Sequence, residues 1–196
     1  MLSWEDKLQK IYTFETVEDF WALFNSVVGP SRLGLQADYY LFKDGVRPSY
    51  EENPKGGVWT FNLEKNNKKK LEETWLHLVL GMIGETMEDG NDILGAVVSI
   101  KRGQDRLSLW TKTAADKELQ VRIAKRLKTS LDLPEGTTLE FKPNQKVREG
   151  GREGGRGGVV GCQEDEDEIW ICRRGRCWSL SRIRRYGREG GRGVCI

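Results

Sequence analysis

Apolar residues at helical spacing predict three helices within the first 145 residues. The first helix begins after Thr16, whose side chain can cap its N-terminus, and Gly29-Pro30 stops it. Its apolar positions, which follow the i, i+3, i+4, i+7 pattern, are Val17, Phe20, Trp21 and Phe24. Similar spacing predicts a second helix over about 71–83 and a third that begins at Thr113 and ends before Pro134.

Segments in which side chains of two kinds alternate lie between these helices and predict strands with unlike faces. In the run 58–63, Trp59, Phe61 and Leu63 alternate with their neighbours. The runs 93–101 and 106–112 flank a turn and read as a hairpin. Further strands are expected over 8–14, 38–42 and 137–142. The pattern predicts an α+β fold, a largely antiparallel sheet with helices on one face.

Composition divides the chain near residue 145. With 37% hydrophobic and 32% charged residues, the whole chain is typical of a globular protein. Residues 146–196, however, hold 12 basic and 8 acidic residues, 12 of the 23 glycines and all four cysteines. Runs rich in Gly, Arg and Glu cannot bury a core. We therefore expect a domain over 1–145 and a low-complexity, disordered tail over 146–196.

Three interpretations of this tail compete. Arg/Gly segments can bind RNA through charge and stacking. The cysteines Cys162, Cys172, Cys177 and Cys195 could ligate zinc, but their spacing lacks the paired short knuckles of a zinc ribbon. The third interpretation is translated repetitive or intronic sequence, because the core REGGRG occurs at 152–157 and again at 188–193. We favour the third.

The residue content of the first 145 positions favours binding over catalysis. This part has no cysteine and a single histidine, His77, so nucleophilic triads and thiolate zinc sites are excluded from it. It has no phosphate-binding glycine loop of the P-loop type, and its scattered acids argue against a paired-carboxylate hydrolase. We predict no catalytic activity, no metal and no cofactor.

The chain also lacks the marks of a membrane or secreted protein. No apolar run reaches the roughly 18 residues that a spanning helix needs. The first residues, MLSWEDKLQK, lack the basic-then-apolar order of a secretory signal. We therefore expect a cytoplasmic protein, with a nuclear pool as an alternative, and no membrane partner.

Some aromatic residues stand in unusual, polar surroundings. Trp4 lies among polar neighbours, and Tyr50-Glu51 places an aromatic ring directly before a carboxylate in a turn-rich stretch. Trp59 and Trp75, by contrast, lie in apolar periodic runs and are expected in the core. An indole in a polar loop is costly unless it contacts something, so Trp4 and Tyr50 are candidate ligand contacts.

Five short motifs follow one another along the chain. They are TVEDFW at 16–21, LFKDGVRP at 41–48, GGVW at 56–59, IGE at 83–85 and GAVVS at 95–99. In order and spacing they resemble eukaryotic translation initiation factor 4E, the mRNA cap-binding protein, over about residues 4–142. The resemblance implies a curved antiparallel sheet backed by three helices, with the 5′ cap held on the concave side. It also implies that the family's first strand is missing before Trp4, which would leave strand edges open.

The resemblance assigns a cap-binding site. A 7-methylguanine ring carries delocalised positive charge and stacks well between electron-rich rings. Aligned to the family, Trp4 and Tyr50 are the two stacking residues, and Glu51 accepts hydrogen bonds from guanine N1–H and the N2 amino group. Trp110 matches the tryptophan that touches the methyl group. The family generally has tryptophan where this chain has Tyr50, so weaker stacking is predicted.

Basic residues complete the site that the resemblance implies. Lys101 and Arg106 match residues that bind the cap's phosphates. The family's middle basic position in this hairpin is Gly103 here, with Arg102 adjacent. Lys146 could partly replace a basic residue that the family carries in a later loop.

The resemblance also implies a partner surface on the helical side. Val17, Trp21, Leu76 and Gly84 match the surface on which initiation factor 4G and 4E-binding proteins lay an amphipathic helix. Because Phe20 and Trp21 are adjacent, they cannot both point into the core, so one of the pair should be exposed. His77 stands where the family usually has an acid, which predicts weaker docking or a changed partner set.

The sequence therefore predicts a protein that binds the 7-methylguanosine cap of mRNA and recruits translation initiation partners. A second hypothesis is a protein-interaction module or translational repressor that has weak or lost cap binding and keeps the Trp21 surface. A third is a general RNA-binding protein driven by the basic tail, which should bind uncapped RNA with a steep salt dependence.

Overall fold

The computed structural model describes residues 8–65, 67–87, 91–133, 136–144 and 178–184, with the backbone alone at 179 and 181–184. Its strands form one antiparallel sheet in the order β1-β7-β2-β4-β5-β3-β6. The strands are β1 Leu8–Phe14, β2 Ala37–Lys43, β3 Gly57–Glu64, β4 Ile93–Ser99, β5 Gln104–Thr111, β6 Glu140–Pro143 and β7 Trp178–Arg184. The helices are α1 Val17–Ser26, the short 3₁₀ helix η2 Pro30–Arg32, α2 Lys68–Ile83 and α3 Lys117–Ser130.

A short polar side chain caps the start of each α-helix. Thr16 Oγ1 accepts a hydrogen bond from the Asp19 backbone N–H at 3.0 Å, as the sequence predicts. The predicted start of the third helix at Thr113 is wrong: α3 begins at Lys117. The physical reason is that Asp116, and not Thr113, supplies the cap, since Asp116 Oδ1 accepts from the Leu119 N–H at 2.9 Å.

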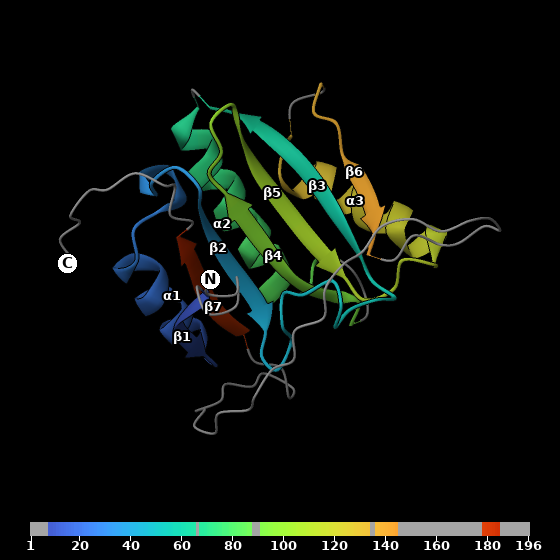
Figure 1. Cartoon of the computed structure of the whole chain (residues 1–196), viewed down its shortest axis with the longest axis horizontal. Coiled ribbons are helices and arrows are strands. Elements are labelled where there is room, and N and C mark those ends of the chain that lie inside the picture. Colours follow the sequence, from blue (N-terminus) through green and yellow to red (C-terminus); the bar gives the residue numbers. More distant parts are fainter. Residues whose placement is uncertain (1–7, 66, 88–90, 134–135, 145–177, 185–196) are drawn as a thin grey trace.

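The main core lies between the helices and one face of the sheet. Figure 1 shows α2 and α3 behind the strands, and all three α-helices contribute to the same buried cluster, through Phe20 of α1, Leu78 of α2 and Ile123 of α3. Burying such apolar side chains is the main source of stability. The predicted α+β fold with a helix-backed antiparallel sheet is confirmed.

Strand β3 shows how alternation divides the two faces of the sheet. Phe61 and Leu63 are buried in the main core, whereas Thr60 and Asn62, between and beside them, line a hollow on the opposite face. Trp59 lies on the helix side, where its Nε1–H donates to Gln120 Oε1 of α3 at 2.8 Å. The sheet face with the hollow therefore carries polar side chains that take no part in the main core.

The structure departs from the predicted disordered tail at β7. This strand lies between β1 and β2 and pairs with both, so the sheet there is not open as expected. Trp178 and Leu180 are buried in the main core. The physical reason is the alternation Trp178-Ser179-Leu180-Ser181, which places two large apolar side chains on one face of a strand. The other predictions for the tail fall on residues outside the described part.

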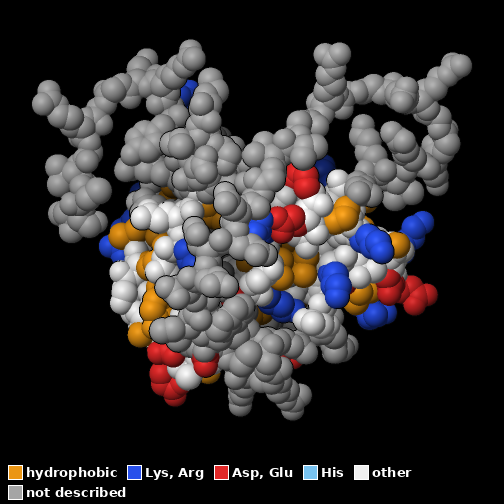
Figure 2. All heavy atoms as spheres, turned by 60° about the horizontal axis from the view of Figure 1, so that its bottom comes forward, with side chains coloured by type: hydrophobic (Ala, Val, Ile, Leu, Met, Phe, Trp, Pro, Cys, Tyr) orange, Lys and Arg blue, Asp and Glu red, His pale blue; other side chains and the backbone are white. Residues whose placement is uncertain are grey.

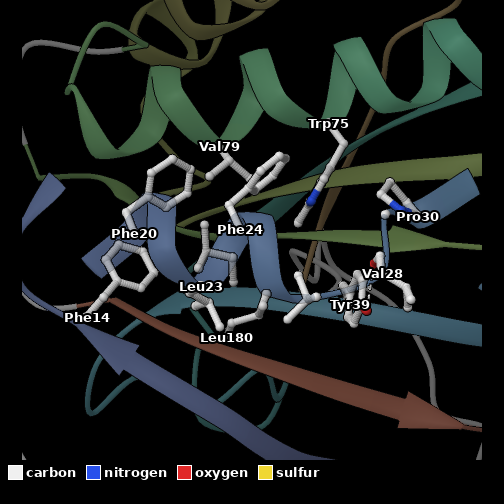
Figure 3. Close-up of a pocket in the computed structure, with 13 residues that line it drawn as sticks. Phe14, Phe20, Leu23, Phe24, Val28, Pro30, Tyr39, Trp75, Val79 and Leu180 are labelled. Carbon is white, nitrogen blue, oxygen red and sulfur yellow. Dashed lines mark hydrogen bonds between the residues drawn. The ribbon is translucent and has the colours of Figure 1, made fainter. Parts of the chain in front are cut away.

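Helix α1 packs over the sheet beside β1 and β7. Figure 3 shows Phe20, Leu23 and Phe24 of α1 directed toward α2 and toward the strand that carries Leu180. A cavity of about 30 Å³ remains among them, which is near the size of a single water molecule. It is thus a packing void under α1 and too small for an organic ligand.

Candidate functional site

A groove of about 820 Å³ lies on the sheet face opposite the helices. Its floor comes from β2, β3, β4 and β5, and β6 closes one side, through Tyr40, Thr60, Val97, Trp110 and Lys142. Trp110 and Arg106 are four residues apart on β5 and face the same way, which separates them by roughly 13 Å. The groove therefore has an aromatic end and a basic end.

Two stacked rings form the aromatic end. The ring centroids of Tyr50 and Trp110 lie 4.7 Å apart with an interplanar angle of 23°. Trp110 is only 4% exposed, since Phe42 also meets it edge-on at 5.6 Å, whereas Tyr50 is 54% exposed. One face of the Tyr50 ring is thus supported by an indole and the ring still offers a surface to a ligand.

Hydrogen bonds hold the loop that carries Tyr50. Asn53 Nδ2 donates to the carbonyl oxygens of Arg47 and Ser49, each at 3.0 Å. Asn144 Nδ2 then donates to Asn53 O at 2.8 Å and ties the loop to the end of β6. These bonds fix the loop against the groove rim, so the Tyr50 ring is positioned before any ligand arrives.

Glu51 presents an ionised carboxylate next to this ring. Ser49 Oγ donates a hydrogen bond to Glu51 Oε2 at 2.5 Å, and the Glu51 N–H donates to Ser49 Oγ at 3.2 Å. The bond from the Ser49 side chain, and secondly one at the Glu51 backbone, lower the pKa of this carboxyl below its ordinary value. At neutral pH the exposed carboxylate can accept hydrogen bonds from a ligand.

The basic end of the groove is formed by Lys101 and Arg106. Lys101 Nζ lies 3.3 Å from Oδ1 of the fully buried Asp38 on β2. Arg106 Nε donates to Asn62 Oδ1 at 3.4 Å and its side chain is exposed. Both cations can meet an anion, although Asp38 offsets part of the charge of Lys101.

Four of the six predicted ligand residues line this one groove: Tyr50, Lys101, Arg106 and Trp110. Glu51 adjoins Tyr50 in sequence but is not part of the groove wall. Trp110 lies beneath Tyr50, and the two rings stack. Trp4, and the further candidate Lys146, fall outside the described residues.

Sequence reasoning missed Lys142 and Tyr40, which also line the groove. Lys142 lies on β6, where its side chain is exposed and its Nζ lies 3.5 Å from Glu140 Oε2. Tyr40 alternates with Tyr39 and Leu41 of β2, which are buried in the main core. That alternation is the signal that could have placed Tyr40 on the groove face.

The helical side of the molecule exposes a second set of predicted residues. Trp21 is 37% exposed and Phe20 is 4% exposed, which confirms the prediction that one of the pair faces out. The two rings meet edge-on at 5.0 Å, so Phe20 supports the exposed indole. Val17 is also exposed at the start of α1.

The α2 residues of this set follow one helix face. Leu76 is partly buried against the core, and Gly84 is exposed at the C-terminal cap of α2. Leu80, which sequence reasoning missed, lies four residues after Leu76 and four before Gly84 and is exposed. The i, i+4, i+8 spacing could have found it.

Comparison with known protein families shows the family to which the chain belongs. The model of the family described as eukaryotic initiation factor 4E matches residues 1–155. The chain belongs to the eukaryotic initiation factor 4E family. The resemblance seen in the sequence is thereby confirmed, and this family consists of cap-binding translation factors that are not enzymes, which confirms the prediction of binding without catalysis.

Two curated relatives of this factor 4E family member are plant proteins. It is 40% identical over 148 residues to the translation initiation factor isoform 4E of Arachis hypogaea, a match that covers 74% of this chain and 72% of the relative. The isoform 4E of Capsicum annuum is 42% identical over 132 residues, covering 66% and 64%. The chain thus spans somewhat less than two thirds of the second relative.

Solved structures of the factor 4E family share its fold. The eIF4E-3 of Ascaris suum in complex with an m2,2,7G cap gives a TM-score of 0.69 at 36% identity, over 77% of this chain and 84% of that one. The eIF4E-3 of C. elegans in complex with the 4E-binding protein Mextli and a cap analog gives 0.68 at 35% identity, over 72% and 82%. Among the described helices of this family member, none combines the length and apolar character that crossing a membrane would require.

Proposed function

We propose that this factor 4E family member binds the 7-methylguanosine 5′ cap of mRNA in the groove and recruits initiation partners through its helical side. The observation that carries the proposal is the arrangement of the two ends of the groove, an exposed ring at one end and two cations at the other. A cap needs this combination, because its base is a flat cation and its phosphates are anions.

The base stacks on the outer face of Tyr50, and Trp110 supports this ring from below. A phenol offers less stacking area than an indole, so the support from Trp110 stiffens a weaker platform. Trp4 is the second stacking residue in this proposal. The Glu51 carboxylate accepts the N1–H and N2 amino hydrogens of the guanine, which discriminates it from bases that lack those donors.

The phosphates extend along β5 toward Lys101 and Arg106. The roughly 13 Å between Trp110 and Arg106 suits a nucleoside triphosphate whose base and terminal phosphate lie at opposite ends. Lys142 approaches the same groove from β6 and adds a third cation.

The partner surface consists of Val17, Trp21, Leu76, Leu80 and Gly84. An amphipathic helix of initiation factor 4G or of a 4E-binding protein would lay its apolar face on these residues. The binding of Mextli by the related eIF4E-3 of C. elegans supports this assignment. The protein would act in the cytoplasm, and its folded domain would comprise 1–145 together with the strand 178–184.

A second function is favoured by one observation, the ion pair between Lys101 and the buried Asp38. A protein in which this ion pair competes with the cap's phosphates would bind the cap weakly and serve as an interaction module or translational repressor.

Titration of tryptophan fluorescence separates the two functions. The full chain is titrated with 7-methyl-GTP and with GTP at fixed salt, and quenching selective for the methylated nucleotide is expected. Glu51→Gln should weaken the binding of 7-methyl-GTP by at least about tenfold, because a hydrogen bond to a charged group is worth about 1.5–3 kcal/mol. The control Glu118→Gln changes an exposed acid at the start of α3, outside the groove, and should bind like the unaltered chain. A folded protein without selectivity for the methylated nucleotide would favour the interaction module.

A further inference from the structure

Strand β7 comes from the far end of the chain but lies inside the sheet. It pairs with β1 from Leu8↔Ile183 to Phe14↔Trp178, and with β2 from Ala37↔Arg184 to Lys43↔Trp178. Within the described residues, β1 pairs with β7 alone. Because adjacent strands are about 4.8 Å apart, removal of β7 would leave β1 and β2 separated by a slot one strand wide.

The surroundings of β7 contact its side chains as well as its backbone. Trp178 and Leu180 are buried on the helix side, where they join the core that contains Phe14 and Leu41. Lys43 Nζ lies 5.8 Å from the centre of the Trp178 ring, within reach of a cation–π contact. Two large apolar side chains at alternate positions are thus held in defined surroundings, as in complexes in which an extended peptide adds a strand to a sheet.

Leu180 also connects β7 to α1. It lines the small cavity beneath that helix together with Phe20 and Leu23 (Figure 3). Since β1 pairs only with β7 in the described part of the chain, and α1 follows β1 directly, β7 joins this whole N-terminal unit to the rest of the sheet.

We propose that the space between β1 and β2 is a strand-binding slot. Its ligand is an extended peptide with large apolar residues at alternate positions, and this chain's own segment Trp178–Arg184 fills it. The sheet edges of β1 and β2 supply backbone hydrogen bonds on both sides of the peptide, and the core beneath α1 supplies the pockets.

The length of the chain before β7 permits this arrangement. Between β6 and β7 lie 34 residues, 144–177. They must reach from β6 at one edge of the sheet to the slot near the other, five strand spacings or about 24 Å. An extended chain of this length could span roughly 110 Å, so the same segment of a second copy could also reach the slot. The oligomeric state of the chain is therefore part of the test.

The slot is distinct from the proposed cap function, because the two described side chains of β7, Trp178 and Leu180, lie in the main core on the helix side and not in the groove wall. Its test uses hydrogen exchange, read by mass spectrometry on the full chain. Leu180→Lys places an ammonium in the core, and exchange in β1 and α1 should rise at least about tenfold while β3 and β5 keep their protection. The matched control Leu35→Lys changes an exposed leucine and should leave all four elements as they are.

Rescue distinguishes a slot from an ordinary structural strand. A synthetic peptide with the sequence of 178–188, WSLSRIRRYGR, is added to the Leu180→Lys chain. Protection of β1 and α1 should return with this peptide and not with a scrambled one that lacks the apolar alternation. Unchanged exchange in Leu180→Lys, or failure of the peptide to restore protection, would overturn the proposal.

Global unfolding of the variant and the oligomeric state of the unaltered chain also bear on the slot. If Leu180→Lys unfolds throughout, refolding upon addition of the peptide supports the slot and its absence refutes it. Light scattering of the unaltered chain should give a monomer, whereas a dimer would assign the strand to a second copy and refute filling by the chain's own segment.

Discussion

At the scale of single residues, the contact between Tyr50 and Trp110 forms the aromatic end of the groove. Tyr50 and Trp110 are 60 positions apart in the sequence, yet their rings stack at 4.7 Å. The family's usual tryptophan would present a larger face to a ligand than Tyr50 does. Here the smaller ring has an indole beneath it and a hydrogen-bonded loop around it, so part of the cost of ordering the site is met before binding.

The pH dependence of cap binding is predicted to depend on Ser49. The pKa of Glu51 is lowered, so its carboxylate stays ionised below the ordinary glutamate range, and its contribution is lost only as the pH falls through that lowered value. Ser49→Ala removes the first cause of the shift. The acid limb of 7-methyl-GTP binding should therefore move to higher pH.

Fluorescence titrations from about pH 7 to about pH 3, which extend below the ordinary glutamate range, check this prediction. Ser26→Ala is the control, because the Ser26 hydroxyl donates to the Ala22 carbonyl in α1, outside the groove. An acid limb that stays in place in Ser49→Ala would show that the Ser49 hydroxyl does not set the ionisation of Glu51.

At the scale of elements, the patterns that predicted well are those whose physical cause is local. Helix α1 begins after Thr16 as expected, because its cap and its apolar stripe lie within ten residues of each other. The predicted start of α3 was wrong because the side chains of Thr113 and Asp116 can both cap a helix, and only the backbone path decides which of them does. Exposure of one residue of the pair Phe20 and Trp21 could be predicted because adjacent helical residues point in different directions.

Elements whose partners are distant in sequence could not be predicted. Strand β7 shows an apolar alternation of only four residues, surrounded by Gly- and Arg-rich sequence, and both strands that pair with it lie more than 130 residues earlier. In the same way, the sequence offers no local sign that Lys142 of β6 lies across the groove from β5. The family resemblance supplied the positions of Lys101 and Arg106, which periodicity alone would not have identified.

The face formed by α1 and α2 is predicted to bind a partner helix through Trp21. Trp21→Ala removes the largest exposed ring of that face. It should weaken the binding of a labelled factor 4G motif peptide by about 2 kcal/mol, which is roughly thirtyfold in affinity. Fluorescence anisotropy measures the peptide affinity. Val121→Ala on α3 is the control, since Val121 is exposed outside this face.

The same variant should keep its affinity for 7-methyl-GTP, because α1 and the groove lie on opposite faces of the sheet. Full peptide affinity in Trp21→Ala would reject the assignment of this face. Equal loss in Val121→Ala would indicate a nonspecific effect.

At the scale of the whole molecule, positive and negative charges nearly cancel. The formal net charge is +2 over 196 residues. Figure 2 shows Lys and Arg side chains next to acidic and apolar ones on the visible part of one face, and not as one continuous basic surface. Because this overall field is weak, the proposed attraction of a capped RNA would come from the few cations in the groove.

The salt dependence of RNA binding is therefore predicted to be shallow and local. With about three phosphate contacts, from Lys101, Arg106 and Lys142, log affinity for a capped oligonucleotide should fall with log salt at a slope of roughly −2.1, and Arg106→Gln should reduce the magnitude of that slope by about 0.7. Lys128→Gln, an exposed cation at the end of α3, should leave it unchanged. Uncapped RNA of the same sequence should bind weakly at every salt concentration.

A steep slope shared by capped and uncapped RNA would instead assign binding to the basic tail. Deleting 146–196 cannot test this alternative cleanly, because the deletion also removes β7 from the sheet. Replacing Arg148, Arg152 and Arg156 by glutamine removes charge from the tail and leaves the strand sequence intact. If groove cations dominate, this triple variant keeps the slope and the preference for capped RNA. If the tail dominates, it loses affinity for both RNAs equally.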